Sequence, residues 1–176
     1  MATRADNPAR TRLLFKWMTG MLVDWFTPKL NTPPPLDGRL DRRARRQVGA
    51  LCWRREDGVL QVLLVTSRDT GRWIIPKGNR MADRDDAAAA AQEAWEEAGV
   101  VGKVGEQHIG SYHYVKRLAR GGERRTAVDV YPLKVRELRK DWPERKERMR
   151  RWFTPVEAIA AVSEPELKAL IASFEA

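Results

Sequence analysis

The alternation of hydrophobic and polar positions first predicts a pair of strands. Residues 48–53 and 60–66 are apolar runs of strand length, and Asp57 and Gly58 lie between them. An Asp-Gly pair between two apolar runs is a strong signal for a tight hairpin turn, because both residues accept the backbone angles that such turns need. We therefore expect an antiparallel hairpin in this part of the chain.

Two more apolar runs, 109–115 and 126–131, predict a second pair of strands, with the Gly-Gly segment 120–125 as the turn between them. Closer to the C-terminus, Thr154 is a good residue to cap the start of a helix, and Glu157 three residues later completes a capping box. Proline at the position after Thr154 also suits the first turn of a helix.

Between the two pairs of strands lies a predicted helix that carries a cluster of acids. Residues 86–98 are rich in Ala and contain no Gly, Pro or β-branched residue. On a helix, Glu93 and Glu97 share one face and Glu96 lies beside them. Three carboxylates in one turn repel one another unless a cation lies between them, and Mg²⁺ is commonly held by one or two carboxylates together with substrate phosphates. The pattern indicates a metal site for a phosphate-bearing substrate, although a solvated acidic helix face would give the same residues.

The spacing around these acids resembles the Nudix hydrolase signature, G-x5-E-x7-R-E-U-x-E-E-x-G-U, where U is a bulky aliphatic residue. Six residues stand on its fixed positions: Gly78, Glu93, Glu96, Glu97, Gly99 and Val100. Ala94 is small for a U position. Arg84 stands where the family usually has Glu, and Gln92 stands where it usually has Arg. Because these two positions mainly support the helix in the family, the departures concern the loop geometry more than the metal chemistry.

The resemblance continues outside the signature, from about residue 48 to the C-terminus. The segment 72–78, which leads into the signature, is similar to the diphosphoinositol polyphosphate phosphohydrolase branch of the family. The resemblance implies an α/β/α sandwich with a mixed β-sheet for residues 48–176, preceded by an N-terminal extension of residues 1–47. About 130 residues suffice for a domain with an adequate core.

The resemblance also implies roles for individual residues. Glu93 and Glu97 would hold Mg²⁺, or Mn²⁺ in its place, together with the backbone carbonyl of Lys77. Glu96 would be the general base. In other branches of the family the base is a different glutamate and Glu96 can itself be a ligand, so the assignment among the three stays open. Substrate phosphates would be bound by arginines, namely Arg45, Arg46, Arg68, Arg148 and, across a loop of different length, Arg124.

Charge and composition add a preference for anionic substrates. The 176-residue chain has a formal net charge of +9, and residues 1–47 hold ten Lys and Arg against four Asp. A dense polyanion would be attracted to such a region, where the planar fork of Arg suits phosphate. Nucleic acid is the other polyanion that such a charge would attract, but the sequence shows no zinc spacing, helix-turn-helix signature or aromatic single-strand platform.

Three less conspicuous residues are the two histidines and the single cysteine. His108 and His113 fit neither a metal-ligand nor a catalytic-triad pattern and are expected to be ordinary strand residues, with His113 the better candidate to line a cleft. Cys52 is the single cysteine, so no intramolecular disulfide can form, and its apolar strand predicts a buried side chain.

The N-terminal extension combines three kinds of sequence. Residues 11–26 carry apolar side chains at helical spacing, residues 32–35 form a Pro-rich connector, and residues 39–46 are basic. The predicted helix can dock on its own domain or on a second subunit, lie on an anionic membrane surface, or serve as a partner-binding or disordered arm. We favour docking, since Lys16 and Lys29 make a weak polar face for membrane binding and Asp24 works against it. No secretory signal or transmembrane run is present, so a cytoplasmic location is expected.

The expected function is Mg²⁺-dependent hydrolysis of a phosphoanhydride bond in a highly phosphorylated small molecule, either a diphosphoinositol polyphosphate or a dinucleoside polyphosphate. An RNA 5′-end pyrophosphohydrolase and a mononucleotide or sugar-nucleotide hydrolase are the enzymatic alternatives. A Nudix module that binds its ligand without catalysis, and a membrane- or nucleic-acid-associated scaffold driven by residues 1–47, are the alternatives without enzymatic activity.

Overall fold

The structure is a computed structural model, and it describes residues 45–118 and 121–176. The predicted helix at 11–26 and the rest of the extension before residue 45 lie outside the described residues. The expected boundary between residues 47 and 48 stays a prediction. The first strand begins at Arg45, so Arg45 and Arg46 belong to that strand instead of preceding it.

One mixed sheet of eight strands organises the described residues, with the order β3-β2-β1-β7-β5 and with β4, β6 and β8 paired to β1, β7 and β2. The long strands β1 and β7 run parallel, and the other pairs are antiparallel. The strands are β1 (Arg45–Glu56), β2 (Val59–Thr66), β3 (Trp73–Ile74), β4 (Lys77–Asn79), β5 (Val100–Val104), β6 (Gly110–Arg117), β7 (Glu123–Leu138) and β8 (Arg150–Phe153).

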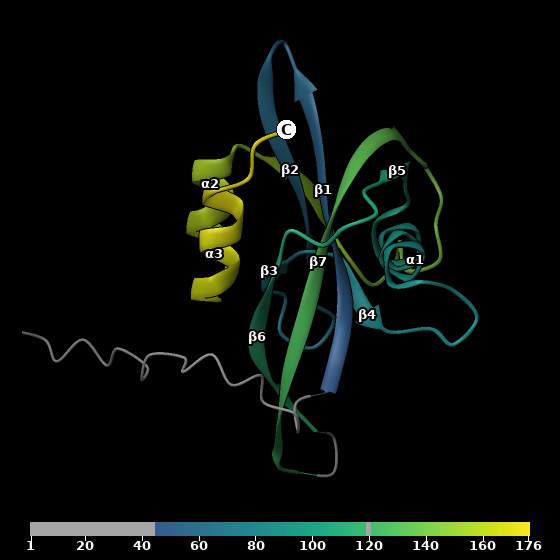
Figure 1. The fold of residues 1–176 in the computed structure, drawn as a ribbon, viewed down its shortest axis with the longest axis vertical. Coiled ribbons are helices and arrows are strands. Elements are labelled where there is room, and N and C mark those ends of the chain that lie inside the picture. The colour runs from purple at the N-terminus through teal and green to yellow at the C-terminus, as the bar shows by residue number, and fades with distance from the viewer. Residues whose placement is uncertain (1–44, 119–120) are drawn as a thin grey trace, which may run out of the picture. The chain divides into compact units, whose positions relative to one another are not determined.

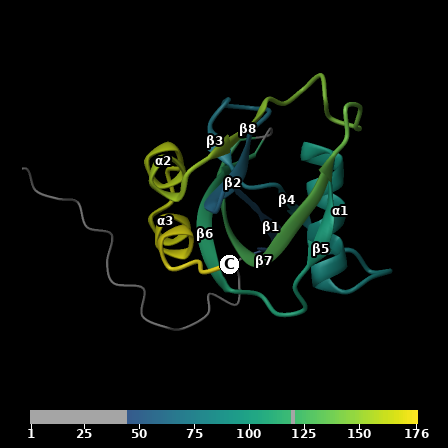
Figure 2. The same cartoon turned by 90° about the horizontal axis from the view of Figure 1, so that it is seen from above.

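Helices cover both faces of this sheet. The helices are α1 (Asp86–Ala98), α2 (Pro155–Ala161) and α3 (Pro165–Ala172). Figure 1 shows α1 on one side of the sheet and α2 with α3 on the other, and Figure 2 shows the same three layers from above. Each face has its own apolar cluster, one beneath α1 and one beneath α2 and α3. The predicted sandwich with a mixed sheet is thereby confirmed for the described residues.

Local sequence explains where α1 begins and ends. The side chain of Asp85 accepts a hydrogen bond from the Ala88 N–H, which caps the first turn. Gly99 ends the helix with a φ of 61°, a left-handed angle that glycine adopts without strain. Four fully buried alanines line the face that packs on the sheet: Ala89, Ala90, Ala94 and Ala98. Their small side chains let α1 lie close to the sheet. This places the acids of the same helix, Glu93, Glu96 and Glu97, near β4.

The other predicted local features are also present. Asp57 and Gly58 have φ angles of 50° and 80° in the turn between β1 and β2. Thr154 and Glu157 form both hydrogen bonds of the capping box at the start of α2. Cys52 is buried, and burial raises the pKa of its thiol. Within the described residues, no helix is both long enough and apolar enough to span a membrane.

Candidate active site

Glu93 is the first acid of the cluster, and it packs directly on the backbone of β4. A side chain at Gly78 would overlap the carboxyl group of Glu93. Only glycine therefore lets the last turns of α1 approach β4 this closely. The two residues stand at the start and in the middle of the signature, and the contact explains why a glycine is needed fifteen positions before a glutamate.

Glu97 is the most buried of the three acids, with 6% of its surface exposed. One carboxylate oxygen accepts a hydrogen bond from the backbone N–H of Lys77 at 3.0 Å. The other forms an ion pair with the Arg148 guanidinium, whose side chain is only 5% exposed. Glu97 thus joins α1 to β4 and to the segment before β8.

The electrostatics of the cluster favour a cation beside the carboxylates. Burial raises the pKa of Glu93 to about 7, and the charges of Glu97 and Glu96 add to the increase. Burial also raises the pKa of Glu97, although Arg148 and Lys77 oppose it. Carboxylates with raised pKa values gain from a nearby cation, because it stabilises their charged form.

The donor set fits a hard divalent cation. All the candidate ligands are oxygens, which Mg²⁺ prefers, and Mg²⁺ needs only one or two carboxylates when waters and phosphates supply the rest. Among the described residues, no three acidic, histidine or cysteine side chains converge into a complete metal cage as they stand. The ion would be held by Glu93, by either Glu96 or Glu97, and by the backbone carbonyl of Lys77.

The acids open onto a cleft of about 930 Å³. Its walls come from the loop between β2 and β3, from β4, α1 and β6, and from the segments that precede β8 and α3. Twelve lining residues are charged. Seven are acidic (Asp69, Glu93, Glu96, Glu97, Glu123, Glu144 and Glu164), and five are basic (Arg68, Arg72, Lys77, Lys116 and Arg148). The cleft itself is therefore slightly acidic.

The comparison with known proteins agrees with this arrangement. A family model described as NUDIX domain matches residues 43–174. The chain belongs to the Nudix family. The predicted resemblance is confirmed, and so is the prediction of a Nudix-type phosphohydrolase at the level of the family.

Two relatives and one solved structure are similar to this Nudix chain. Diphosphoinositol polyphosphate phosphohydrolase 3-beta of Homo sapiens is 36% identical over 119 residues, or 65% of this chain and 67% of the relative. Nudix hydrolase 12, mitochondrial, of Arabidopsis thaliana is 39% identical over 109 residues, or 57% of this chain and 51% of the relative. The crystal structure of C. elegans Ap4A hydrolase has a TM-score of 0.57 at 22% identity, covers 73% of this chain and 94% of its own, and shows a shared fold.

The five arginines predicted to bind phosphate fall into two groups. Arg68 and Arg148 line the cleft, whereas Arg45, Arg46 and Arg124 are not among the residues that line it. Arg68 is 56% exposed and lies 3.3 Å from Glu147 and 3.5 Å from Glu144. Arg148 uses its nitrogens on Glu97, on Glu144 and on the Thr66 carbonyl. These three bonds leave two of the five guanidinium N–H groups of Arg148, but its side chain is only 5% exposed.

Arg46 is instead part of a cluster centred on the buried Asp129, which sequence reasoning did not identify. Two nitrogens of Arg46 donate to the Asp129 carboxylate, with Nη2 to Oδ1 at 2.8 Å and Nε to Oδ2 at 3.2 Å. Ser111 and Arg80 donate to the same carboxylate at 2.7 Å and 3.1 Å. Arg80 also forms an ion pair with Asp86 at the start of α1 at 2.6 Å. The cluster thus ties β1, β6 and β7 to the signature loop.

Glu144 is a second residue that sequence reasoning missed. Its backbone N–H donates to the Glu96 carbonyl at 3.1 Å, and its side chain pairs with Arg148 four residues later. These contacts bring a fourth carboxylate to the cleft beside the three of the signature. The four-residue spacing between Glu144 and Arg148 is the signal that could have pointed to it.

Lys77 and the two histidines also have defined surroundings. The Lys77 ammonium lies 4.6 Å from the centre of the Tyr114 ring, and burial lowers its pKa. His113 contacts the Glu166 carboxylate and does not line the cleft, so it is a poor candidate for the site. His108 packs edge-on against the ring of Tyr131. Both histidines therefore have structural environments.

Proposed function

We propose that this chain hydrolyses a phosphoanhydride bond in a highly phosphorylated small molecule, with Mg²⁺ as its cofactor and Mn²⁺ as a substitute. A diphosphoinositol polyphosphate and a dinucleoside polyphosphate are the two substrate classes that we consider. The names of the relatives support the first class. The observation that carries the proposal is the packing of Glu93 against Gly78, with all three signature acids lining a large cleft.

The position of each residue in the cleft suits it to one role. Glu93 and Glu97 would hold the cation together with the Lys77 carbonyl, while the Arg148 guanidinium fixes the orientation of Glu97. A bound divalent ion supplies neutralisation of phosphate charge and a lower pKa for water. Glu96 would accept the proton of the water that attacks phosphorus, and the bond to the bridging oxygen would break. The products are two phosphate-terminated pieces, and Arg68 would bind the substrate at the rim.

Glu96 is suited to the role of base by its hydrogen bonding. Its Oε1 accepts a hydrogen bond from Gln92 Nε2 at 2.7 Å, and no other hydrogen bond to its side chain occurs among the described residues. The side chain is therefore oriented while one oxygen stays available for a proton. The assignment of base and ligands among Glu93, Glu96 and Glu97 remains part of the proposal.

A substrate panel with and without Mg²⁺ tests this proposal. The purified protein should release phosphate products from at least one polyphosphate only when the metal is present. Glu96→Gln keeps the size of the side chain and removes the base, so kcat should fall about 10²–10⁴-fold with little change in KM. Glu106→Gln is the matched control, because Glu106 is exposed on a loop away from the cleft. Activity of Glu96→Gln within about threefold of the parent would contradict the assignment of the base.

The same panel separates the alternatives. Preferred cleavage of triphosphorylated RNA ends would favour the RNA pyrophosphohydrolase, and saturable binding without turnover would favour a ligand-binding module. A cytoplasmic location stays a prediction, and one Nudix relative is named as mitochondrial. Fractionation of cells that express the full chain tests that point.

A further inference from the structure

The C-terminal end of α1, directly after the signature acids, is held by a segment that is distant in sequence. The last carbonyl groups of a helix have no partner within that helix. The Glu96 carbonyl accepts a hydrogen bond from the Glu144 N–H at 3.1 Å, and the Gly99 carbonyl accepts one from the Arg139 N–H at 2.9 Å. Both donors lie in the segment that joins β7 to β8, which Figures 1 and 2 show beside α1. The position of the helix end therefore depends on this segment.

Arg150, the first residue of β8, supplies a side-chain donor at the same place. Its Nη1 donates to the carbonyl of Ala98, the last residue of α1. Its Nη2 donates to the carbonyl of Arg139, the first residue after β7, at 2.8 Å. Because the guanidinium is planar and rigid, the two bonds fix the helix end and the start of the β7–β8 segment relative to each other.

The ring of Trp142 covers this guanidinium. The guanidinium carbon of Arg150 lies 3.9 Å from the centre of the Trp142 ring, within the range of a cation–π contact. The Trp142 Nε1 is buried without a hydrogen-bond partner among the described residues, so the indole is placed here by its packing. A side chain at Gly99 would approach Arg150 Nη1 to 2.8 Å and Trp142 Cβ to 3.0 Å. The signature glycine thus leaves room for both.

The charge of Arg150 also suits the end of α1. The C-terminal end of a helix carries partial negative charge, and the last turn of α1 contains no basic residue of its own. Arg150 brings a cation to this end from another strand. Arg151 has different surroundings, because successive side chains of a strand point to opposite faces. Its guanidinium lies over the ring of Phe153, which belongs to the apolar cluster beneath α2 and α3.

We infer that Arg150 is a positioning residue for the proposed hydrolysis. It holds the last turn of α1, and with it Glu96 and Glu97, at a fixed place in the wall of the cleft. The same guanidinium holds the segment that carries Glu144. Arg150 itself is not among the residues that line the cleft, so it acts through these acids. The inference rests on the proposed function, since it assigns a role in that reaction.

The first test separates positioning from substrate binding. Arg150→Met keeps the apolar length of the side chain and removes the guanidinium. We expect kcat to fall about tenfold with less than about twofold change in KM, because the acids are displaced while the substrate contacts stay intact. The Mg²⁺ concentration for half-maximal activity should rise roughly threefold. Arg150→Lys keeps the charge and a donor, so its kcat should lie between those of the parent and Arg150→Met.

Arg151→Met is the matched control, since it removes the neighbouring guanidinium from the other face of β8. Its kcat should stay within about twofold of the parent. Urea unfolding at the assay temperature shows whether each variant is folded during the assay. A folded Arg150→Met with the kcat of the parent would overturn the inference, and so would equal losses in Arg150→Met and Arg151→Met.

Trp142→Leu decides the question if Arg150→Met does not fold. It removes the aromatic ring that covers the guanidinium and leaves both hydrogen bonds of Arg150 possible. We expect kcat to fall about threefold with KM unchanged, because the guanidinium is then held less firmly. The kcat of the parent in this variant would contradict the inference.

Hydrogen exchange tests the inference without metal or hydrolysis. Amide exchange of the metal-free parent, Arg150→Met and Trp142→Leu is followed by NMR. In the variants, the N–H groups of Glu144 and Arg139 should exchange at least about tenfold faster, while those in the centre of β1 keep their rates. Unchanged rates, or a uniform increase that includes β1, would contradict the inference. Faster exchange at these two groups, in a protein whose parent hydrolyses no polyphosphate, would instead contradict the proposed function and support the contact of Arg150 with the helix end.

Discussion

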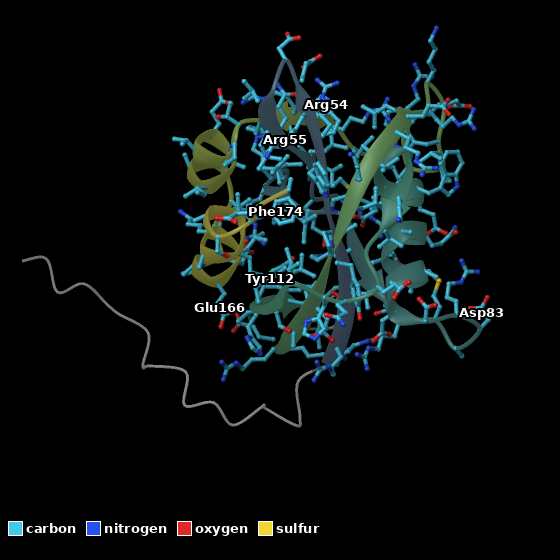
Figure 3. The ribbon with its side chains drawn as sticks, turned by 45° about the horizontal axis from the view of Figure 1, so that its top comes forward. Arg54, Arg55, Asp83, Tyr112, Glu166 and Phe174 are labelled. Atoms are coloured by element: carbon cyan, nitrogen blue, oxygen red, sulfur yellow. The ribbon has the colours of Figure 1, made fainter. Side chains whose placement is uncertain are left out.

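Arg84 donates a hydrogen bond to the side chain of Gln92, with 3.2 Å between Nη1 and Oε1. These are the two positions at which the chain departs from the Nudix signature, and they contact each other. Gln92 in turn donates to Glu96, and Arg84 is paired with Asp83. Figure 3 labels Asp83 on the loop that precedes α1. The two departures therefore compensate for each other, as replacement of both members of an ion pair can.

This contact predicts how the signature residues can be restored. Arg84→Glu alone places a new acid beside Gln92 and near Glu96, and Gln92→Arg alone places two arginines together. Each should lower kcat by about 3–10-fold with little change in KM, because Glu96 loses its orientation. The double variant Arg84→Glu/Gln92→Arg forms an ion pair again and should recover most of the loss. Steady-state kinetics of all four proteins give the coupling directly. Losses that simply add in the double variant would show that the two positions act independently.

The raised pKa of Glu93 predicts an unusual pH dependence of stability. The pKa of about 7 in the folded protein exceeds the ordinary value of 4.5, so the folded state binds the proton more tightly than the unfolded state. The related stability is complete below pH 4.5 and is lost as the pH rises through 7. Without divalent metal, the free energy of unfolding should therefore decrease by roughly 1 kcal/mol between pH 5 and pH 8, after allowance for solvent screening, and the melting temperature should fall with it. Differential scanning fluorimetry measures the melting temperature across this pH range.

Glu93→Gln is the matched control for that measurement. Because Gln does not titrate, the decrease in melting temperature between pH 5 and pH 8 should largely disappear. Millimolar Mg²⁺ with a phosphate ligand should restore the stability of the parent at pH 8 and should do less for the variant. An identical pH dependence in the two proteins would show that another group titrates.

Arg46 and Arg68 should respond differently to replacement by Ala. Arg46→Ala removes donors from the buried Asp129 and should cost roughly 1.5–3 kcal/mol of stability at pH 7, with a small effect on KM. Arg68→Ala removes an exposed cation of the cleft and should raise KM without a measurable loss of stability. Urea unfolding of both variants measures the loss of stability, and substrate titration measures the change in KM. A large rise in KM for Arg46→Ala in a stable protein would support a direct phosphate contact instead.

The effect of Arg46→Ala should also depend on pH. Burial alone would raise the pKa of Asp129, but hydrogen bonds from Ser111 and Arg46 and the nearby positive charges outweigh it, so the pKa lies below its ordinary value. Stability from such a carboxylate is present above the ordinary pKa and is lost as the pH falls through the lowered one. The difference between the parent and Arg46→Ala should therefore shrink in strong acid.

Arg148 is expected to contribute to the stability of the fold more than to substrate binding. Arg148→Met leaves Glu97 buried without its ion pair and should cost about 3–5 kcal/mol of stability. Adding Glu97→Gln removes the orphaned charge, so the double variant should regain part of that stability while staying inactive. Equilibrium unfolding in urea measures both changes. If Arg148→Met is as stable as the parent, the buried pair does not contribute to the fold as we describe.

Local features of the sequence determined the elements that depend on neighbouring residues. The bounds of α1 follow from its Ala-rich composition, from Asp85 at its start and from Gly99 at its end. The turn at Asp57 and Gly58 and the capping box at Thr154 are equally local. The spacing of the signature acids also placed them on one helix face, because helical periodicity needs no knowledge of distant residues.

Only the tertiary structure decided which side chains meet across the sheet. Arg46 and Gln47 are adjacent in sequence, yet Gln47 lines the cleft and Arg46 binds Asp129, because successive side chains of a strand point to opposite faces. The parallel register of β1 with β7, in which Val48 lies opposite Asp129, brings Arg46 and Asp129 to the same face. Short strands such as β3 and β4 leave almost no periodic signal of their own.

The same reason explains the ion pairs of the cleft that sequence reasoning missed. Glu97 and Arg148 are 51 positions apart, and Arg72 and Glu164 are 92 positions apart. A charge in a sequence predicts a solvated surface residue until packing removes water from it and supplies a partner. The sequence therefore determined the chemistry of the signature helix, and the long-range packing of the sheet determined which other charges surround it.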